Sequence, residues 1–115
     1  MENTTRIKVK VTLSKNENFF GPGIVALLEL IDETGSVKEA CRQMELSYTK
    51  GWHIINRAEK ELDFELITRV RGGREGGGAS VTPRGRSLIE KYKVMQAEIQ
   101  SLAGEIYQKT FPDGL

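Results

Sequence analysis

Arginines and glycines between residues 69 and 82 form a pattern that suits binding to a polyanion. Five glycines fall within residues 72–78, short β-prone runs flank them, and Arg69, Arg71 and Arg74 lie among them. Glycine has no Cβ, so the backbone of such a hairpin could approach a phosphate chain closely while the guanidinium groups supply positive charge. The segment 66–82 therefore predicts a hairpin that contacts DNA as a wing.

Two other structures would share this composition. The backbone amides of a glycine-rich loop can cradle a nucleotide phosphate, but the Gly-Lys-Ser/Thr ending of a P-loop is missing here. A hairpin that is merely flexible is the other alternative.

The preceding segment, 36–62, predicts two helices joined by a tight turn. Ser36 and Glu39 have the spacing of a capping box, in which the serine caps a backbone amide and Glu39 reaches back, so a helix is expected over 36–44. Ser47 caps a second helix over 47–62. Ala40 and Gly51 are small and would let the two helices cross closely. The pattern is typical of a helix-turn-helix, although an ordinary αα-hairpin would share it.

In the helix-turn-helix interpretation, residues 47–62 form a recognition helix whose N-terminal turn enters the major groove. No acidic residue lies between Glu45 and Glu59 to repel phosphate. Lys50, His53 and Asn56 could read base edges. The exposed face of this helix is expected to comprise Tyr48, Thr49, Lys50, Trp52, His53, Asn56 and Arg57. For Trp52, a place in the core is an equal alternative.

Three further segments predict the remaining elements. Arg6 to Leu13 alternates between apolar and polar residues, which predicts a half-buried strand over 6–13. Pro22 could open a helix over 22–34 that ends before Gly35. Thr82 followed by proline predicts the start of a long helix over 83–109, and Arg84 would add a phosphate contact near the wing.

Apolar residues of the long helix recur at alternating spacings of four and three, as in a heptad seam. They are Leu88, Tyr92, Met95, Ile99, Leu102 and Ile106. Such a seam exceeds the surface that a small domain offers, so it predicts that two copies pair as a homodimer. Packing against the chain's own core is the alternative.

The composition predicts a single domain over residues 1–115, of the α+β class and mostly α. Seventeen basic and sixteen acidic residues nearly cancel, which argues against a protein that coats nucleic acid without sequence preference. The one cysteine, Cys41, and the one histidine are too few for a disulfide or a zinc site, and no catalytic set emerges, so we expect no metal, no cofactor and no enzyme. No segment resembles a signal peptide or a membrane span, so we expect a cytoplasmic protein.

Most of the chain resembles the DNA-binding domain of the molybdate-dependent regulator family, ModE, and its helix-turn-helix spacing is also similar to that of LysR-type regulators. The most specific matches are Ser-Tyr-x-x-x-Trp from Ser47 and the glycine run that ends at Ala79. The residues that carry the resemblance are Phe20, Gly21, Pro22, Gly23, Gly35, Ser36, Ala40, Ser47, Tyr48, Trp52, Arg69, Gly72, Gly73, Gly76, Gly77, Gly78, Ala79, Thr82 and Gly85.

The resemblance implies a dimeric winged helix-turn-helix transcription factor that binds a two-fold symmetric site. It also implies that Ser47, Tyr48, Lys50, Trp52, the wing arginines and Thr82 lie at or near DNA, and Ser36 joins this candidate set. Two departures stand out. Cys41 replaces a residue that is usually alanine, and the molybdate-sensing domains of the full regulators would have to follow Leu115, so we expect the protein to act without a molybdate-sensing domain of its own.

We therefore predict a winged helix-turn-helix homodimer that binds a pseudo-palindrome in double-stranded DNA and regulates transcription, without a membrane association and with a separate effector or partner protein as a possibility. The main alternative is a protein-interaction adaptor that keeps the fold without binding DNA. A phosphate-binding enzyme is the third.

Overall fold

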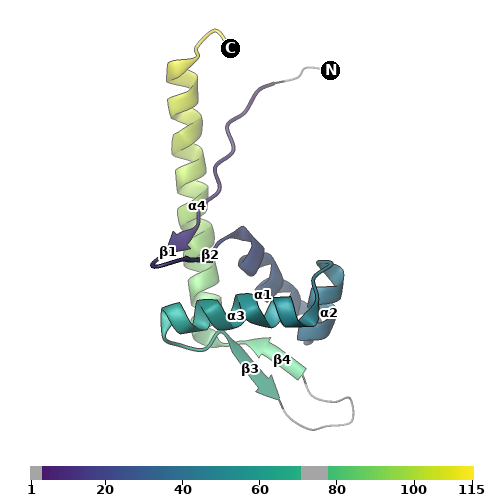
Figure 1. The fold of residues 1–115 in the computed structure, drawn as a ribbon. Coiled ribbons are helices and arrows are strands. Elements are labelled where there is room, and N and C mark those ends of the chain that lie inside the picture. Colours follow the sequence, from purple (N-terminus) through teal and green to yellow (C-terminus); the bar gives the residue numbers. More distant parts are fainter. Residues whose placement is uncertain (1–3, 71–77) are drawn as a thin grey trace.

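The computed structural model describes residues 4–70 and 78–115. Its elements are β1 (Leu13–Ser14), β2 (Asn18–Phe20), α1 (Pro22–Thr34), α2 (Val37–Gln43), α3 (Tyr48–Leu62), β3 (Ile67–Val70), β4 (Gly78–Val81) and α4 (Pro83–Thr110). Three helices pack together above the β3–β4 hairpin, and α4 rises away from them (Figure 1). The mostly helical α+β class with a long C-terminal helix is confirmed.

The core forms around α1. Leu27, Leu28 and Ile31 have no exposed surface, and Ile55 of α3 and Leu66 before β3 are equally buried. Each such aliphatic side chain stabilises the fold by roughly 1.5–3 kcal/mol relative to exposure. The core thus joins the predicted recognition helix and the base of the hairpin to one central helix.

α2 begins at a cap that forms only half of the predicted capping box. Ser36 Oγ accepts a hydrogen bond from the Glu39 backbone N–H at 3.0 Å, as expected. The reverse contact is wrong, because the Glu39 carboxylate instead accepts from Arg42 Nη2 at 2.6 Å and from Gln43 at 3.1 Å. A charged donor one turn further along binds a carboxylate more strongly than a backbone amide does. The Ser36 amide is left to bond Thr34 Oγ1 at 3.2 Å.

The close crossing of α2 and α3 depends on Gly51. A Cβ built on Gly51 would lie 2.3 Å from Cys41 Sγ, so the glycine and the thiol share a space that no larger pair would fit. The tight turn between the helices places Glu45 at φ 57°, a left-handed conformation that few residues with a side chain adopt. Leu46 then donates its backbone N–H to the Cys41 carbonyl at 2.9 Å.

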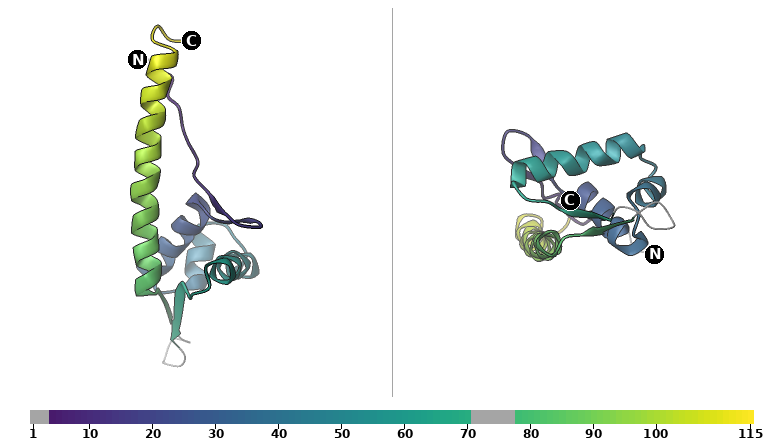
Figure 2. Two further views of the ribbon diagram at one scale, coloured as in Figure 1. Left: turned by 90° about the vertical axis from the view of Figure 1, so that its left-hand side faces the viewer. Right: turned by 90° about the horizontal axis from the view of Figure 1, so that it is seen from below.

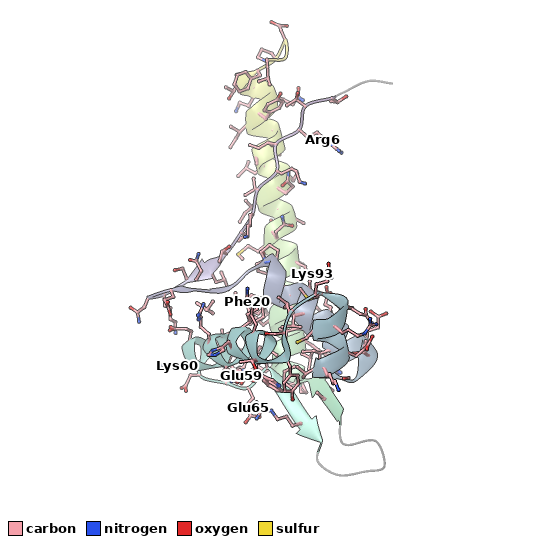
Figure 3. The ribbon with its side chains drawn as sticks, turned by 45° about the vertical axis from the view of Figure 1, so that its right-hand side comes forward. Arg6, Phe20, Glu59, Lys60, Glu65 and Lys93 are labelled. Carbon is pink, nitrogen blue, oxygen red and sulfur yellow. The ribbon has the colours of Figure 1, made fainter. Side chains whose placement is uncertain are left out.

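The β3–β4 hairpin is attached to the helices by side chains on α3 and α1. Its strands are antiparallel, with Ile67 opposite Val81 and Arg69 opposite Ala79. Glu59 of α3 accepts the backbone N–H of Leu66 at 2.7 Å and that of Ile67 at 3.2 Å (Figure 3). The root of the hairpin is therefore held directly against α3.

The second strand of the hairpin, β4, is held by α1 and by the residue that follows this helix. Asp32 of α1 accepts the Val81 N–H at 3.2 Å and binds Arg86 of α4 through two hydrogen bonds of 2.8 and 3.0 Å. The Ala79 N–H reaches the Gly35 carbonyl at 2.9 Å. Arg71 and Arg74 of the predicted wing lie outside the described residues.

The predicted strand over 6–13 is wrong, because only Leu13–Ser14 pairs as a strand, with β2. Residues 4–12 run as an extended arm along α4 (Figure 2). Side chains of the helix supply the hydrogen bonds that a neighbouring strand would have supplied. Gln100 binds the Val9 N–H at 2.9 Å and the Ile7 carbonyl at 2.7 Å, and Gln96 binds the Val9 carbonyl at 3.2 Å. Alternating residues predicted an extended backbone, but not its partner.

A candidate nucleic-acid interface

The N-terminal half of α3 presents polar side chains to solvent. Ser47 Oγ accepts the Lys50 N–H at 3.1 Å and starts the helix, with Tyr48 as its first residue. Gly51, Ile55 and Ala58 face inward. The predicted recognition residues that lie exposed are Tyr48, Thr49, Lys50, His53, Asn56 and Arg57. Their common face carries hydrogen-bond donors and acceptors that match base edges in a major groove.

Trp52 lies at the boundary between the core and this face. It is half-buried and packs against the hydrophobic core. Its indole also meets the Tyr48 ring edge-on, with centroids 6.3 Å apart, and the Arg69 guanidinium carbon lies 4.2 Å from its ring centroid. Trp52 is thus both a core anchor and part of the surface, so the two alternatives in the sequence are not exclusive. The Arg69 contact was not foreseen, because no spacing rule links a helix to a strand that follows it.

The far part of the recognition face is less favourable for phosphate than the sequence suggested. An open hollow on this side is lined by His53, Asn56, Arg57 and Lys60, and also by Glu17 and Glu61. Arg57 lies 3.9 Å from the Glu17 carboxylate. Glu17 belongs to the loop between β1 and β2, far from α3 in sequence, so its approach could not be predicted from the helix alone. The two basic side chains of this hollow are therefore balanced by two acidic ones, whereas Lys50 lies in the first turn of α3.

Three hydroxyl groups of the predicted site act as helix caps. Ser36, Ser47 and Thr82 each accept a backbone N–H three residues further along. Thr82 also donates its hydroxyl to the Glu65 carbonyl at 2.8 Å. These contacts position the elements around the site, and a DNA contact by the same residues stays a prediction.

Arg84 stands at the start of α4, with its guanidinium carbon 4.1 Å from the centroid of the Phe64 ring. Arg69 and Arg84 thus lie near opposite ends of α3, because Trp52 belongs to its second turn and Phe64 follows its C-terminus. Each guanidinium stacks on an aromatic face, so the N–H donors around its edge can still point toward a phosphate.

Other ionisable groups near the site serve the fold. A hydrogen bond from Arg86 holds the pKa of Asp32 below its ordinary value, and the bond from Arg42 lowers the pKa of Glu39 to about 2. Both carboxylates are therefore charged at neutral pH and bound to arginines. Burial raises the pKa of the Cys41 thiol, which favours the protonated form expected of a packing residue.

Across residues 4–70 and 78–115, no three His, Cys, Asp or Glu side chains are grouped so that they could hold a metal ion. None of the helices in these ranges is long and apolar enough to cross a membrane.

The predicted dimer seam on α4 divides into two parts. Tyr92 is 5% exposed, packs edge-on against Phe20 at 5.5 Å and donates its hydroxyl to the Val11 carbonyl at 2.6 Å. Its assignment to a dimer interface is wrong, because its surface is already covered within one chain. Leu88 and Met95 are half-buried against the same core. The seam residues that remain exposed are Ile99, Leu102 and Ile106.

The chain is similar to several curated bacterial proteins over most of its length. It is 33% identical to the molybdenum transport protein ModE of Azotobacter vinelandii, over 74% of this chain and 32% of that protein. It is 36% identical to the molybdenum-pterin-binding protein MopB of Rhodobacter capsulatus, over 80% of this chain and 34% of that protein. It is 31% identical to the DNA-binding transcriptional dual regulator ModE of Escherichia coli K12, over 86% of this chain and 38% of that protein. The chain thus spans about a third of the length of these relatives.

A solved structure and a family model cover the region of the site. The crystal structure of a CbnR_DBD–DNA complex matches 76% of this chain and 91% of the other with a TM-score of 0.50 and 18% identity, which supports the winged helix-turn-helix fold. The model of the bacterial regulatory helix-turn-helix proteins of the lysR family matches residues 25–86, from α1 through the start of α4. More than half of the chain is covered by that match, and the chain therefore belongs to the lysR family of bacterial regulatory helix-turn-helix proteins.

Proposed function

We propose that the protein is a transcriptional regulator that binds a pseudo-palindromic site in double-stranded DNA as a homodimer. The observation that carries this proposal is the N-terminal half of α3, whose polar face is exposed beside the Arg69 end of the hairpin. A helix of this kind reads base edges in the major groove, and an adjacent wing contacts the flanking backbone.

The roles within the site follow from side-chain chemistry. Lys50 and His53 suit guanine O6 and N7, Asn56 suits adenine, and Thr49 could touch a thymine methyl. Arg69 and Arg84 suit phosphate, as do Arg71 and Arg74, which lie outside the described residues. Because Glu17 and Glu61 border His53 and Asn56, we assign Lys50 and Thr49 the larger share of base reading.

The exposed apolar residues of α4 support the homodimer. Ile99 is 37%, Leu102 58% and Ile106 54% exposed, although they recur on one stripe of a helix. Water-exposed apolar residues in such a row are typical of a surface that pairs. The stripe lies on the part of α4 that extends away from the other helices (Figure 1), so two copies could pair there while both α3 helices face DNA. The two α3 helices would then lie about 34 Å apart, which is one turn of the duplex.

Selection from a random pool of duplex DNA tests this function directly. The purified protein is incubated with the pool near 150 mM salt, and bound fragments are sequenced. We expect an inverted repeat with half-sites about ten base pairs apart. The same selection is repeated with Lys50→Ala, which should lower the enrichment of one base position in each half-site. Folded, dimeric protein that enriches no sequence would contradict the proposal and favour a protein-interaction adaptor.

The names of two relatives include molybdenum, but the proposal concerns DNA binding alone. The shared region contains the helix-turn-helix, and no three His, Cys, Asp or Glu side chains of the described residues are grouped so that they could hold a metal ion. Adding molybdate to the selection is a simple extension, and we expect the enriched sequences to stay the same.

A further inference from the structure

Arg69, Trp52 and Tyr48 bring the hairpin and the recognition helix into contact at the surface proposed to face DNA. Tyr48 and Trp52 are four residues apart on α3, so they lie one above the other on the same side of the helix. Arg69 belongs to β3, and its guanidinium lies over the indole. The cluster therefore joins the start of α3 to β3, although the rest of α3 and the loop after it lie between them in the sequence.

The backbone explains why Arg69 reaches this position. Side chains along a strand alternate between its two faces, so Arg69 shares a face with Ile67, which is 3% exposed and belongs to the core. The face that Ile67 turns toward the helices continues past the edge of the core at Arg69. There the next surface is the half-buried indole of Trp52, and a guanidinium can stack on it while its N–H groups point outward.

We propose that Trp52 is a positioning residue that holds the Arg69 guanidinium beside the N-terminal turns of α3, so that one phosphodiester group flanking the half-site is bound in fixed relation to the bases that α3 reads. Tyr48 packs edge-on against the indole and fixes its orientation. This inference rests on the proposed function and deepens it, because it names which wing cation is fixed and by what. The indole itself makes no base contact in this arrangement.

Preorganisation is the physical reason that the stack matters. An arginine side chain loses much rotamer freedom when it binds phosphate, and part of that loss has already occurred if the guanidinium rests on an aromatic face. A cation–π contact at a partly exposed site corresponds to about a two- to fivefold change in an equilibrium constant. Removal of the indole should therefore weaken DNA binding by about that factor, through Arg69.

A double-mutant cycle measures this dependence. The variants are Trp52→Leu, Arg69→Gln and the double variant, and affinity for the selected duplex is measured at several salt concentrations. We expect Trp52→Leu to lower affinity about two- to fivefold in the wild-type background and less than about twofold when Arg69 is already glutamine. Arg69→Gln should also reduce the slope of log affinity against log salt by about 0.9, the value for one phosphate contact.

Three further variants make the test specific. Trp52→Phe keeps an aromatic face and should retain most of the affinity, even if Trp52→Leu proves too unstable to study. Lys109→Gln removes one positive charge at the far end of α4 and should change neither affinity nor salt slope, because that distance is well beyond the Debye length of about 8 Å. Arg69→Lys keeps the charge but not the flat guanidinium, so it should keep the salt slope and lose affinity.

Fluorescence gives a second measurement that needs no DNA. Trp52 is the only tryptophan in the sequence, so tryptophan emission reports on the surroundings of this one indole, which include Arg69. In the free protein, Arg69→Gln should shift or change the intensity of that emission, and Lys109→Gln should not.

The outcomes separate the inference from the function on which it rests. Equal losses for Trp52→Leu in both backgrounds would overturn the inference, since the indole would then act without Arg69. Wild-type protein that binds no duplex would overturn the proposed function and this inference with it. Coupled losses together with the emission change would support both.

Discussion

Replacing Gly51 with alanine should destabilise the contact between α2 and α3, and replacing Cys41 with alanine should remove that defect. The added methyl would lie 2.3 Å from Cys41 Sγ but 3.9 Å from Cys41 Cβ. The first distance is a severe overlap, and the second is ordinary van der Waals contact. Cys41 is 1% exposed, so the thiol cannot turn out into solvent. Either the side chain leaves its rotamer or the two helices separate.

The expected energies follow from these distances. Overpacking a core by one methyl group costs about 1–3 kcal/mol, and alanine gains about 1 kcal/mol over glycine inside a helix. Gly51→Ala should therefore lower the free energy of unfolding by roughly 0–2 kcal/mol. Cys41→Ala removes one buried sulfur and should cost about 1 kcal/mol. In the double variant the new methyl occupies space that the sulfur left, so its stability should lie within about 1 kcal/mol of wild type.

Urea unfolding followed by far-UV circular dichroism measures all four proteins. The interaction free energy of the cycle should be about 1–3 kcal/mol in the stabilising direction. Gly23→Ala is a suitable control, because a Cβ there meets nothing within 4 Å. If the destabilisations of the two single variants simply add in the double variant, the thiol is not what limits residue 51 and the reasoning is refuted.

Three other predictions concern the contacts that join the elements. Asp32 has a pKa lowered below 3.8 by Arg86, so its stabilising contribution is present above about pH 4 and is lost as pH falls through the folded-state pKa. Asp32→Asn should therefore cost about 1 kcal/mol in urea unfolding at pH 7, with a smaller difference from wild type at pH 3, and a constant difference would contradict this. Glu59→Ala should lower the free energy of unfolding by about 1–3 kcal/mol and speed amide exchange at the start of β3, because two backbone N–H groups lose their acceptor. Glu59→Gln keeps an acceptor and should lower it less; equal losses for the two variants would count against this contact. Leu102→Lys should shift dimers to monomers in analytical ultracentrifugation, since about 1.5–3 kcal/mol of apolar burial is lost per subunit, while Ser101→Lys should not, and an unchanged dimer would exclude this stripe.

Helix α3 and its neighbours were predictable because their signals are local. Ser36, Ser47 and Thr82 each cap an amide three residues away, and that distance in sequence is also the distance in space. The inward face of α3 follows from its 3.6-residue period in the same way. The exposed face that includes Lys50 and His53 is then what remains.

Contacts between distant segments were not predictable. Alternation in residues 6–13 indicated an extended chain, but only the fold shows that Gln96 and Gln100 of α4 take the place of a partner strand. Nothing in the local sequence distinguishes Glu59 from the acids near it, yet it accepts the backbone N–H groups of Leu66 and Ile67 at the root of the hairpin. The approach of Glu17 to Arg57, on the exposed face of α3, was likewise unpredictable because the two residues are far apart in sequence.

Helix α4 shows most clearly where prediction from the sequence stops. A heptad period records which side of a helix is apolar, and the same period serves burial within one chain and pairing between two. The fold assigns Tyr92 to the first use, because Phe20 and Val11 reach it, and leaves Leu102 exposed.

The sequence by itself determined the helices, their caps and the polar face of α3, because these depend on residues within one or two turns of each other. The tertiary structure decided which apolar residues of α4 stay exposed, which carboxylates hold the hairpin, and that Arg69 rests on Trp52. Those outcomes depend on side chains that meet only after the chain has folded, and no periodicity records such distances.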